Sequence, residues 1–416
     1  MDEIVVHKFG GSCLRERGDI DRMAEIISDF EGRPLVVVSA LWGMTDRLYR
    51  AAREPRYAQR LVRDLKAQHL IFSPGLDQGM FADLFERVLK GISNELVKLS
   101  SSEPSMRSEN LILAAGERLS ALAVAHRFRT QGIPAYPVGA EDIGLKLSGK
   151  GRAKQIDISR SDVSLKRNTL SEGIPILTGW FGEGEDGNIA LLSRGGSDHS
   201  AAAFAKLMNA NKLVLWKDVD GVKRINPRWG LESQSVPYLG YGEALELSLH
   251  GTPVIHPATV LPLIEDGIPL EIRNVNFPSK PVPTIVGPDV STGEIKAIGC
   301  QPGVAVIEIS GPIESNLLLR IEQSEITPWS INSTPEKSTI IMPAHEIHLI
   351  DDLIDGSIEH RSAMLSIIGP FKEISDMDYE IVSSNEYGTR IIIDTDDITE
   401  TLNRLNQSLF SLQDCK

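Results

Sequence analysis

The stretch Ile4–Ser12, IVVHKFGGS, places a lysine near the end of a short apolar run that stops at two glycines. The run Ile4–Phe9 predicts a β-strand, and Gly10 and Gly11 predict a sharp turn where that strand ends. In open α/β folds, ligands bind beyond the carboxyl ends of the parallel strands. Paired glycines let backbone amides approach an anion, and Lys8 adds a positive charge there. A plain Gly-Gly turn with a solvent-facing lysine explains the same letters, so this stretch alone leaves both interpretations open.

Outward from this strand, residues 1–290 alternate apolar runs with amphipathic stretches, which predicts an α/β domain with a largely parallel sheet flanked by helices. Residues 34–40 (PLVVVSA) form a continuous apolar run, as expected of a strand that is covered on both faces. Residues 49–99 are rich in Arg, Lys, Leu and Ala and predict a helical insertion. Further strands are expected at residues 133–138, 174–181, 212–219 and 270–275, and further helices at residues 110–129, 198–208, 242–249 and 258–265.

The pattern changes after a passage rich in proline and glycine, residues 277–293, which predicts a linker. Residues 304–309 and 364–368 are similar apolar strands, and each is followed by Gly-Pro. This repetition predicts a duplicated small α+β module. We therefore expect one domain at residues 1–290 and a second, paired domain at residues 296–416.

Composition limits the partners. A net charge of −14 argues against nucleic acid or an anionic membrane, because both attract a basic surface. No stretch approaches the ~18–20 apolar residues of a membrane span, and the acidic first residues do not resemble a signal peptide. Three cysteines without a CxxC pair suit a reducing compartment and predict no cysteine-based metal site. We expect a cytoplasmic protein without a nucleic-acid partner, a membrane partner or a protein-bound metal.

A second glycine loop, Arg194–Asp198 (RGGSD), opens a predicted helix. The amides at a helix N-terminus attract anions, and the arginine fork suits a carboxylate. Ser197 or Asp198 as a simple helix cap would explain those two residues, but it would not explain the arginine and the paired glycines before them.

Two further motifs carry charge at places where the sequence permits two interpretations. Glu117 interrupts an apolar helix, so it faces either solvent or a polar site. Residues 217–222 (KDVDGV) follow a strand and form either an ordinary Asp-Gly turn or a loop that holds nucleotide phosphates, with Mg²⁺ bound through water.

As an ordered set, these motifs resemble the aspartate kinases of the amino-acid kinase superfamily. The matching stretches are VHKFGGS (6–12), VVSALWGMT (37–45), AGER (115–118), SRGGSDHSA (193–201), DVDGV (218–222), YGEALEL (241–247), HPAT (256–259) and IRNV (272–275). The resemblance implies the amino-acid kinase fold over residues 4–290. It also implies paired ACT-like regulatory modules in the tail, through which the chain would form a homodimer.

The resemblance implies an acceptor side that binds L-aspartate. Ser39 and Thr45 would line the pocket, Glu117 would help to hold the amino acid, and Arg194 would clamp a substrate carboxylate. Asp198 would hold the α-ammonium group or orient the acceptor.

The resemblance also implies a nucleotide side that binds ATP, with Mg²⁺ held mainly by phosphates and water. Lys8 would neutralise charge on the γ-phosphoryl group in transfer, with the Gly10 and Gly11 amides beside it. The remaining residues that match this side are Ser12, Lys217, Asp218, Lys223 and Arg228.

The sequence departs from the family pattern where charge matters most. Lys217 replaces a usual threonine, Lys223 a usual tyrosine, and Pro253 a usual nucleotide-contacting lysine. We predict that Lys217 or Lys223 supplies the charge that is missing at Pro253.

The implied reaction converts ATP and L-aspartate into ADP and 4-phospho-L-aspartate, the entry to lysine, threonine and methionine synthesis. Two alternatives stand beside it. One is a catalytically weak paralogue that acts as a regulatory subunit, which the proline at 253 favours. The other is a kinase of the acetylglutamate or glutamate 5-kinase type, against which the Glu117 motif and the ACT-like tail argue.

Overall fold

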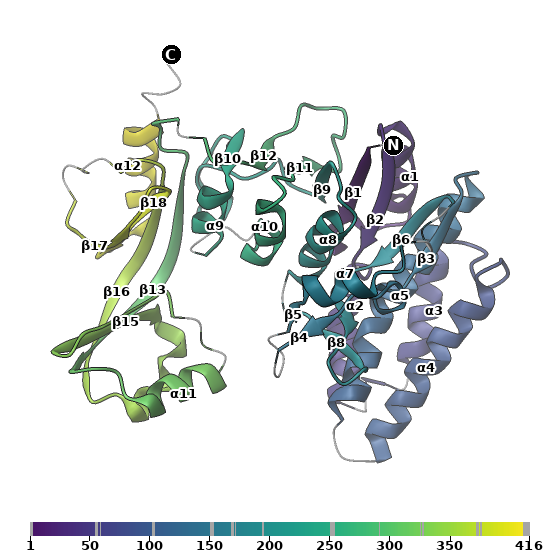
Figure 1. The fold of residues 1–416 in the computed structure, drawn as a ribbon, viewed down its shortest axis with the longest axis horizontal. Coiled ribbons are helices and arrows are strands. Elements are labelled where there is room, and N and C mark those ends of the chain that lie inside the picture. Colours follow the sequence, from purple (N-terminus) through teal and green to yellow (C-terminus); the bar gives the residue numbers. More distant parts are fainter. Residues whose placement is uncertain are drawn as a thin grey trace. The chain divides into compact units, whose positions relative to one another are not determined.

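The computed structural model describes residues 3–54, 57–58, 60–101, 105–149, 154–167, 170, 172–193, 195–249, 254–290, 292–324, 326, 328–371, 374 and 377–410. The chain forms two compact units (Figure 1). Unit 1 contains Met1–Gly221 and Ala258–Gly287, and unit 2 contains Val222–Pro257 and Pro288–Lys416.

Unit 1 is built on a sheet with the strand order β12-β11-β9-β1-β2-β6-β3. Neighbouring strands run parallel, except that β12 runs antiparallel to β11. The predicted, largely parallel sheet is therefore confirmed. Its strands are β1 (Ile4–Phe9), β2 (Arg33–Val38), β3 (Ala135–Val138), β6 (Ile174–Thr178), β9 (Lys212–Lys217), β11 (Leu270–Asn274) and β12 (Thr284–Gly287).

Helices flank this sheet, as predicted. The long helix α5 packs on β2, β3 and β6, whereas α8 packs on β1, β2 and β9. The predicted insertion is helical, and its helices α3 and α4 lie beside α5 (Figure 1). The helices of unit 1 are α1 (Asp19–Asp29), α2 (Met44–Arg53), α3 (Leu61–Phe72), α4 (Ala82–Ser101), α5 (Met106–Thr130), α6 (Ala140–Ile143), α7 (Ile158–Ser164), α8 (Gly196–Leu207) and α10 (Pro257–Ile264).

Two sequence predictions in unit 1 were wrong in detail. The strand expected at residues 174–181 is broken after β6, because Trp180 adopts a left-handed backbone with φ of 72° and redirects the chain into β7 (Phe181–Glu183). The passage at residues 277–293 is not only a linker, because it contains β12 paired with β11. Short pairs complete unit 1: β7 with β8 (Ile189–Leu191), and β4 (Leu147–Ser148) with β5 (Gln155–Ile156).

Unit 2 contains an antiparallel sheet of six strands in the order β14-β15-β13-β16-β18-β17. Together with the helices of this unit, the sheet has the α+β character that the sequence predicts for the tail. Its elements are β13 (Ala297–Ser310), α11 (Ser315–Gln323), β14 (Ser330–Ser333), β15 (Lys337–Pro343), β16 (Gly356–Ile368), β17 (Tyr379–Ser384), β18 (Gly388–Ile393) and α12 (Ile398–Phe410). Unit 2 also contains β10 (Tyr238–Gly240) and α9 (Tyr241–Leu249).

The two central strands of unit 2 are longer than predicted. β13 and β16 pair with each other over most of their length, which extends both strands beyond the expected 304–309 and 364–368. Each half of the sheet has its own core. One core lies under α11 and contains Leu317 and Ile321, and the other lies under α12 and contains Leu402 and Leu405. The two cores support the predicted duplication.

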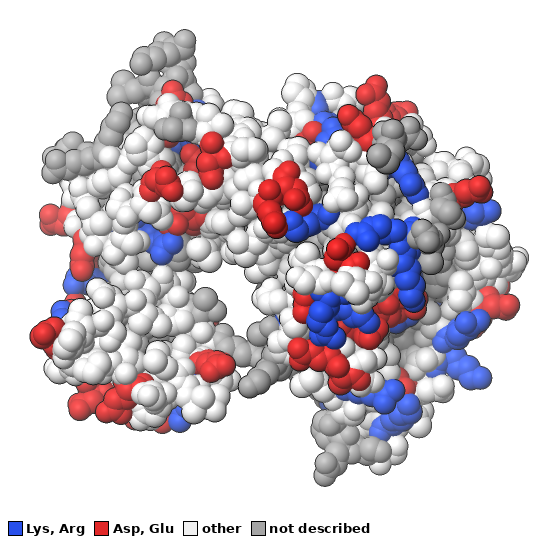
Figure 2. Space-filling view, in the orientation of Figure 1, with Lys and Arg blue, Asp and Glu red and all other residues white. Residues whose placement is uncertain are grey.

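The surface of the described residues mixes both signs of charge. Acidic and basic side chains are interspersed over the face drawn in Figure 2. In the part of the chain that the structure describes, no helix combines the length and apolar character needed to span a bilayer.

The packing of α5 yields a stability prediction. Phe128 is fully buried in the core of unit 1, whereas Met106 on the same helix is 55% exposed. Phe128→Ala should lower the free energy of unfolding by about 3–5 kcal/mol, because it removes a large buried ring and leaves a cavity. Met106→Ala, the matched control, should change it by less than about 0.5 kcal/mol. Urea titrations followed by circular dichroism measure both values, and equal losses would contradict this account of the core.

Candidate active site

Strand alternation places two lysines on the same face of the central sheet. Phe9 of β1 and Trp216 of β9 are register partners and stack with ring centroids 5.8 Å apart. Successive side chains of a strand point to opposite faces. Lys8, just before Phe9, and Lys217, just after Trp216, therefore both point to the other face, which α8 covers.

Asp198 joins these two lysines from the first turn of α8. Its Oδ1 lies 2.6 Å from Lys8 Nζ, and its Oδ2 accepts a hydrogen bond of 2.7 Å from Lys217 Nζ. The Lys8 and Asp198 residues are 4% and 7% exposed, so both charges are largely shielded from water. One carboxylate thus holds two ammonium groups at the carboxyl edge of the parallel strands, where the sequence predicts an anion site.

The charges of the cluster shift one another's pKa values. Burial alone would raise the pKa of Asp198, but the charges of Lys217 and Lys8 outweigh burial and hold that pKa below its usual range. Burial lowers the pKa of Lys8, and repulsion by Lys217 adds to this effect. The pKa of Lys217 is raised, because attraction to Asp198 overcomes the effect of burial. With all three groups ionised, the cluster carries one net positive charge.

Glycines let backbone and side chains come close together here. A Cβ atom on Gly10 would lie 3.1 Å from Lys8 Nζ, and one on Gly11 would lie 3.2 Å from the Ala40 carbonyl oxygen. Both distances are tighter than an ordinary contact, so larger residues would push on the lysine and on the chain after β2. On the other side of Ala40, Gly116 of α5 lets the helix pack against the Ala40 methyl group.

That close packing brings Glu117 into the interior. Glu117 is 2% exposed, and its Oε1 accepts a 3.2 Å hydrogen bond from the Ala40 N–H. Its Oε2 is buried and has no hydrogen-bond partner among the described residues. Burial raises the pKa of Glu117 to about 8, although the Ala40 hydrogen bond and the charge of Lys8 oppose this shift. Of the two interpretations of Glu117, the structure supports the polar interior.

The remaining acceptor-side candidates lie in the segments around this packing. Ser39 directly follows β2, and its N–H donates to the Phe9 carbonyl across 3.2 Å. Thr45 lies in the first turn of α2, and Ser12 in a 3-10 turn after β1; all three are half-buried. Arg194 lies outside the described residues, so its carboxylate clamp stays a prediction.

Asp218 has a partner that the sequence reasoning missed. Arg15 Nη2 contacts Asp218 Oδ2 at 2.9 Å, and the Arg15 guanidinium lies 4.2 Å from the centre of the Trp42 ring. The sequence gives only a weak signal for this contact, because an arginine shortly after a glycine turn is part of no periodic pattern. Within the described ranges, no group of three His, Cys, Asp or Glu side chains is placed to hold a metal ion.

The last nucleotide-side candidates, Lys223 and Arg228, belong to unit 2. Lys223 Nζ donates to Ser235 Oγ at 3.1 Å, and Arg228 Nη2 donates to the Cys300 carbonyl at 2.7 Å. Pro253 lies outside the described residues.

Comparison with known proteins fits this arrangement. The sequence pattern of the amino acid kinase family matches residues 3–274. This match spans more than half of the 416 residues, and the chain belongs to the amino acid kinase family.

Curated relatives carry the name that the motifs indicated. The bifunctional aspartokinase/homoserine dehydrogenase 2 of Arabidopsis thaliana is 30% identical over 315 residues, which are 73% of this chain and 34% of the plant protein. Aspartokinase 3 of Bacillus subtilis is 29% identical over 396 residues, which are 88% of this chain and 86% of that protein. The chain thus spans about a third of the bifunctional relative and most of the bacterial one.

Solved structures share the fold. E. coli aspartokinase III, in complex with aspartate and ADP, has a TM-score of 0.82 at 20% identity, covering 98% of this chain and all of that one (100%). Clostridium acetobutylicum aspartate kinase has a TM-score of 0.75 at 20% identity, covering 97% and 100%. The amino-acid kinase fold expected from the motifs is confirmed.

The raised pKa of Glu117 yields a prediction on stability. A carboxyl group with a folded-state pKa of about 8 binds its proton more tightly when folded, so its contribution to stability falls as pH rises from about 4.5 to about 8. Glu117→Gln removes this loss. We compare the free energy of unfolding of the variant with that of the parent at pH 5 and at pH 9. The difference should shift in favour of the variant from pH 5 to pH 9 by an amount on the order of a few kcal/mol.

Urea titrations at both pH values measure this difference. Glu109→Gln, at a half-buried position on the same helix, is the control and should follow the parent protein at both pH values. A parallel pH trend for Glu117→Gln and the parent would show that Glu117 is not held in a desolvated site.

Proposed function

We propose that the chain transfers the γ-phosphoryl group of ATP to the side-chain carboxylate of L-aspartate. A carboxylate oxygen forms a bond to the γ-phosphorus, and the bond from that phosphorus to the bridging β–γ oxygen breaks. The products are ADP and 4-phospho-L-aspartate. The acceptor is already an anion at neutral pH, so no general base is needed.

The cluster of Lys8, Asp198 and Lys217 carries this proposal. Phosphoryl transfer requires in-line positioning and neutralisation of charge on the transferring group. Two ammonium groups at the carboxyl edge of a parallel sheet supply positive charge in a site with little water, where it acts more strongly than in solvent. The family membership and the aspartokinase names of the relatives support the same reaction.

Asp198 acts in this proposal mainly by positioning. Both of its oxygens contact lysines, at 2.6 and 2.7 Å, so the carboxylate fixes the two ammonium groups at a set separation. The carboxylate thereby favours the charged form of each lysine in a buried place, where burial alone would favour loss of a proton. Holding the substrate ammonium group would require Asp198 to share this charge with a third cation.

Glu117 is the stronger candidate for the substrate ammonium group. Its buried Oε2 has no partner among the described residues, and a cation arriving there would stabilise the ionised carboxylate. Arg194 stays our candidate for a substrate carboxylate, and Ser39 and Thr45 for the pocket wall.

ATP would bring Mg²⁺ bound to its phosphates, and the metal would neutralise part of the phosphate charge. Asp218 of the motif at residues 218–222 is a candidate ligand for this metal, but its carboxylate already pairs with Arg15. This pairing suits a metal that is held mainly by phosphates and water. Lys223 and Arg228 stay candidates for contacts to the nucleotide.

We also propose that two copies of unit 2 associate through ACT-like modules to form a homodimer. The edge strands β14 and β17 expose Ile331 (45%) and Ile381 (52%). Unpaired strand edges with apolar side chains favour association with a further strand.

The proposal is tested by ADP release with L-aspartate, acetylglutamate, glutamate or no acceptor. We expect release above background with L-aspartate only.

Lys8→Ala should lower kcat by orders of magnitude with an unchanged circular dichroism spectrum, because it removes a cation from beside the transferring phosphoryl group. Lys206→Ala, at the far end of α8 and paired with Glu265 and Asp266, is the control and should retain activity. Near-normal kcat in Lys8→Ala would contradict the role assigned to Lys8. ADP release with another acceptor but not with L-aspartate would show that L-aspartate is not the substrate.

Lys217→Thr restores the usual family residue and should nevertheless weaken ATP binding. The variant loses one cation near a polyanion, and we expect the affinity for a non-hydrolysable ATP analogue to fall roughly tenfold or more. The Lys217→Thr variant should also lose activity only at higher pH than the parent on the alkaline side of the kcat–pH profile. The reason is that Lys8 loses a repelling neighbour, so that the pKa of Lys8 rises. Calorimetric titration and pH–rate profiles measure the two effects. Unchanged affinity in both Lys217→Thr and Lys223→Met would refute the charge-replacement hypothesis.

A further inference from the structure

Arg15 reaches across the carboxyl ends of three neighbouring strands. It follows β1, its guanidinium lies 4.2 Å from the centre of the Trp42 ring, and its Nη2 contacts Asp218 Oδ2 at 2.9 Å. Trp42 lies in the segment after β2, and Asp218 directly follows β9. These three strands are neighbours in the order β9-β1-β2, so Arg15 lies at the same edge as Lys8 and Lys217. Ligands of open α/β folds bind beyond this edge.

The turn that carries Arg15 is fastened to both neighbouring strands. The Cys13 thiol donates to the Trp216 carbonyl of β9 at 3.2 Å. The Leu14 carbonyl accepts a 3.0 Å hydrogen bond from the Trp42 N–H, which ties the turn to the segment after β2. Because the backbone before Arg15 is already held in place, less conformational freedom is lost when this side chain binds a ligand.

The guanidinium group of Arg15 retains donors for a further partner. Among the described residues it reaches a hydrogen-bond acceptor through Nη2 alone, and its side chain is 48% exposed. The Trp42 ring beneath it is itself 55% exposed. Phosphate oxygens match the planar fork of an arginine, which can donate two parallel hydrogen bonds. The arginine is therefore held in position with donors open to an anion.

The neighbours of Arg15 favour the nucleotide over the acceptor. Arg15 follows the turn at Gly10 and Gly11, whose amides are the proposed phosphate contacts. Its partner Asp218 belongs to the nucleotide-side motif at residues 218–222. An anion that lies on the glycine turn would thus have this guanidinium group in the same loop.

The charge of a nucleotide also calls for a further cation. A triphosphate carries several negative charges, whereas the cluster of Lys8, Asp198 and Lys217 supplies one net positive charge. Opposite charges attract more strongly near a protein surface than in bulk water. An additional cation at the same edge of the sheet therefore stabilises a bound phosphate chain.

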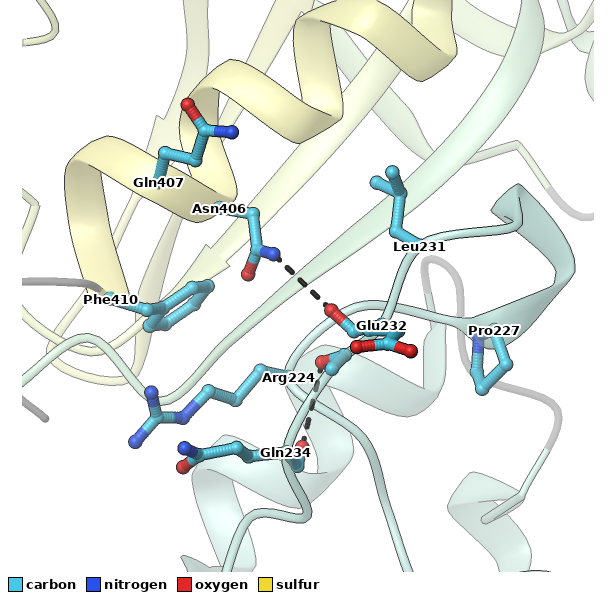
Figure 3. A pocket seen from close by; sticks show the side chains of 9 residues that line it. Arg224, Pro227, Leu231, Glu232, Gln234, Asn406, Gln407 and Phe410 are labelled. Atoms are coloured by element: carbon cyan, nitrogen blue, oxygen red, sulfur yellow. Dashed lines mark hydrogen bonds between the residues drawn. The ribbon is translucent and has the colours of Figure 1, made fainter.

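Arg224 of unit 2 also lies over an aromatic ring, but it lacks the surroundings of Arg15. It lines a pocket between the segment 224–234 and α12 (Figure 3). Its guanidinium lies 5.0 Å from the centre of the Phe410 ring and points away from the Glu232 carboxylate (Figure 3). This pocket belongs to unit 2, whereas the lysine cluster belongs to unit 1. What distinguishes Arg15 is its place at the carboxyl edge of parallel strands.

We propose that Arg15 binds the phosphate chain of the nucleotide, while Trp42 and Asp218 hold its guanidinium group in place. The donors that Asp218 leaves unused would contact phosphate oxygens beside the Gly10 and Gly11 amides. This inference rests on the proposed function, because it assigns Arg15 to the nucleotide of that reaction. In this arrangement Trp42 is a positioning residue, which acts through the arginine.

Calorimetric titration of the full chain with Mg²⁺-ADP and with a non-hydrolysable Mg²⁺-ATP analogue tests the contact. Arg15→Gln should weaken binding of both nucleotides roughly tenfold or more, because it removes charge-assisted hydrogen bonds to phosphate. Arg15→Lys keeps the charge but loses the fork, so its affinities should lie between those of Arg15→Gln and the parent. The KM for L-aspartate should stay unchanged. The urea midpoint should also stay unchanged, because an exposed ion pair contributes little to stability.

Arg53→Gln is the matched control. Arg53, the last residue of α2, contacts Glu109 at 3.5 Å and lies 4.8 Å from the centre of the Tyr49 ring. Its side chain is 54% exposed, so it resembles Arg15 in exposure and in both kinds of partner. This variant should bind both nucleotides as the parent does.

The role of Trp42 is tested by a pair of substitutions. Trp42→Ala removes the ring beneath the guanidinium group and should weaken nucleotide binding by about two- to fivefold, the size of an exposed cation–π contact. Trp42→Phe retains a ring and should restore most of this loss. A loss that is the same in both variants overturns the positioning role.

The outcomes separate this inference from the proposed function. Unchanged nucleotide affinity in Arg15→Gln, or an equal loss in Arg53→Gln, overturns the inference even if L-aspartate still drives ADP release. A rise in the KM for L-aspartate alone also overturns it and assigns Arg15 to the acceptor. A loss of nucleotide affinity specific to Arg15 in a chain that phosphorylates no acceptor supports the contact and removes the proposed function. A parent chain that binds neither nucleotide overturns both.

Discussion

The contact of Asp198 with Lys8 and Lys217 is the interaction on which the candidate site depends. Each lysine comes from a different strand, and neither has another negative partner as close among the described contacts. Bringing two ammonium groups together away from water is unfavourable without a carboxylate between them. The first turn of α8 supplies that carboxylate, so the helix, the two strands and the local charge balance are parts of one arrangement.

This arrangement would let a protein with a negative net charge bind an anionic ligand. The chain as a whole carries a net charge of −14, yet the cluster carries one net positive charge at the carboxyl edge of the sheet. Salt screens distant surface charges within about 10 Å at ordinary ionic strength, so nearby buried charges decide what binds. The extra lysine at position 217 strengthens the local potential without changing the overall sign.

Unit 2 combines two of the nucleotide-side candidates, Lys223 and Arg228, with the C-terminal sheet. Arg228 donates to Cys300 of β13, and Lys296 forms a buried ion pair of 2.6 Å with Glu243 of α9. Arg390 of β18 contacts Glu246 of the same helix at 2.5 Å. The segment Val222–Pro257 is thus fastened to the sheet by several charged contacts. A ligand that alters this sheet would therefore act on the same unit that contains Lys223 and Arg228.

The sequence by itself determined the fold class and the main site motifs. Apolar runs such as Ile4–Phe9 and residues 34–40 predicted strands correctly, because burial on both faces requires continuous apolar residues. The sequence also placed Lys8 at the carboxyl end of its strand, since a glycine pair ends the strand there. It failed at residues 174–181, where the left-handed backbone of Trp180 has no local signature, and at β12, whose pairing with β11 overrides a passage rich in proline and glycine.

Only the tertiary structure decided which charges meet. Lys217 looked like part of a turn, and the parallel register of β1 and β9 put it on the same face as Lys8, beside a carboxylate from α8. Glu117 had two possible environments from helix periodicity, and the close approach of Gly116 to Ala40 placed it in the interior. These contacts join residues far apart in the chain. Their geometry follows from strand register and close packing, which no local run of residues encodes.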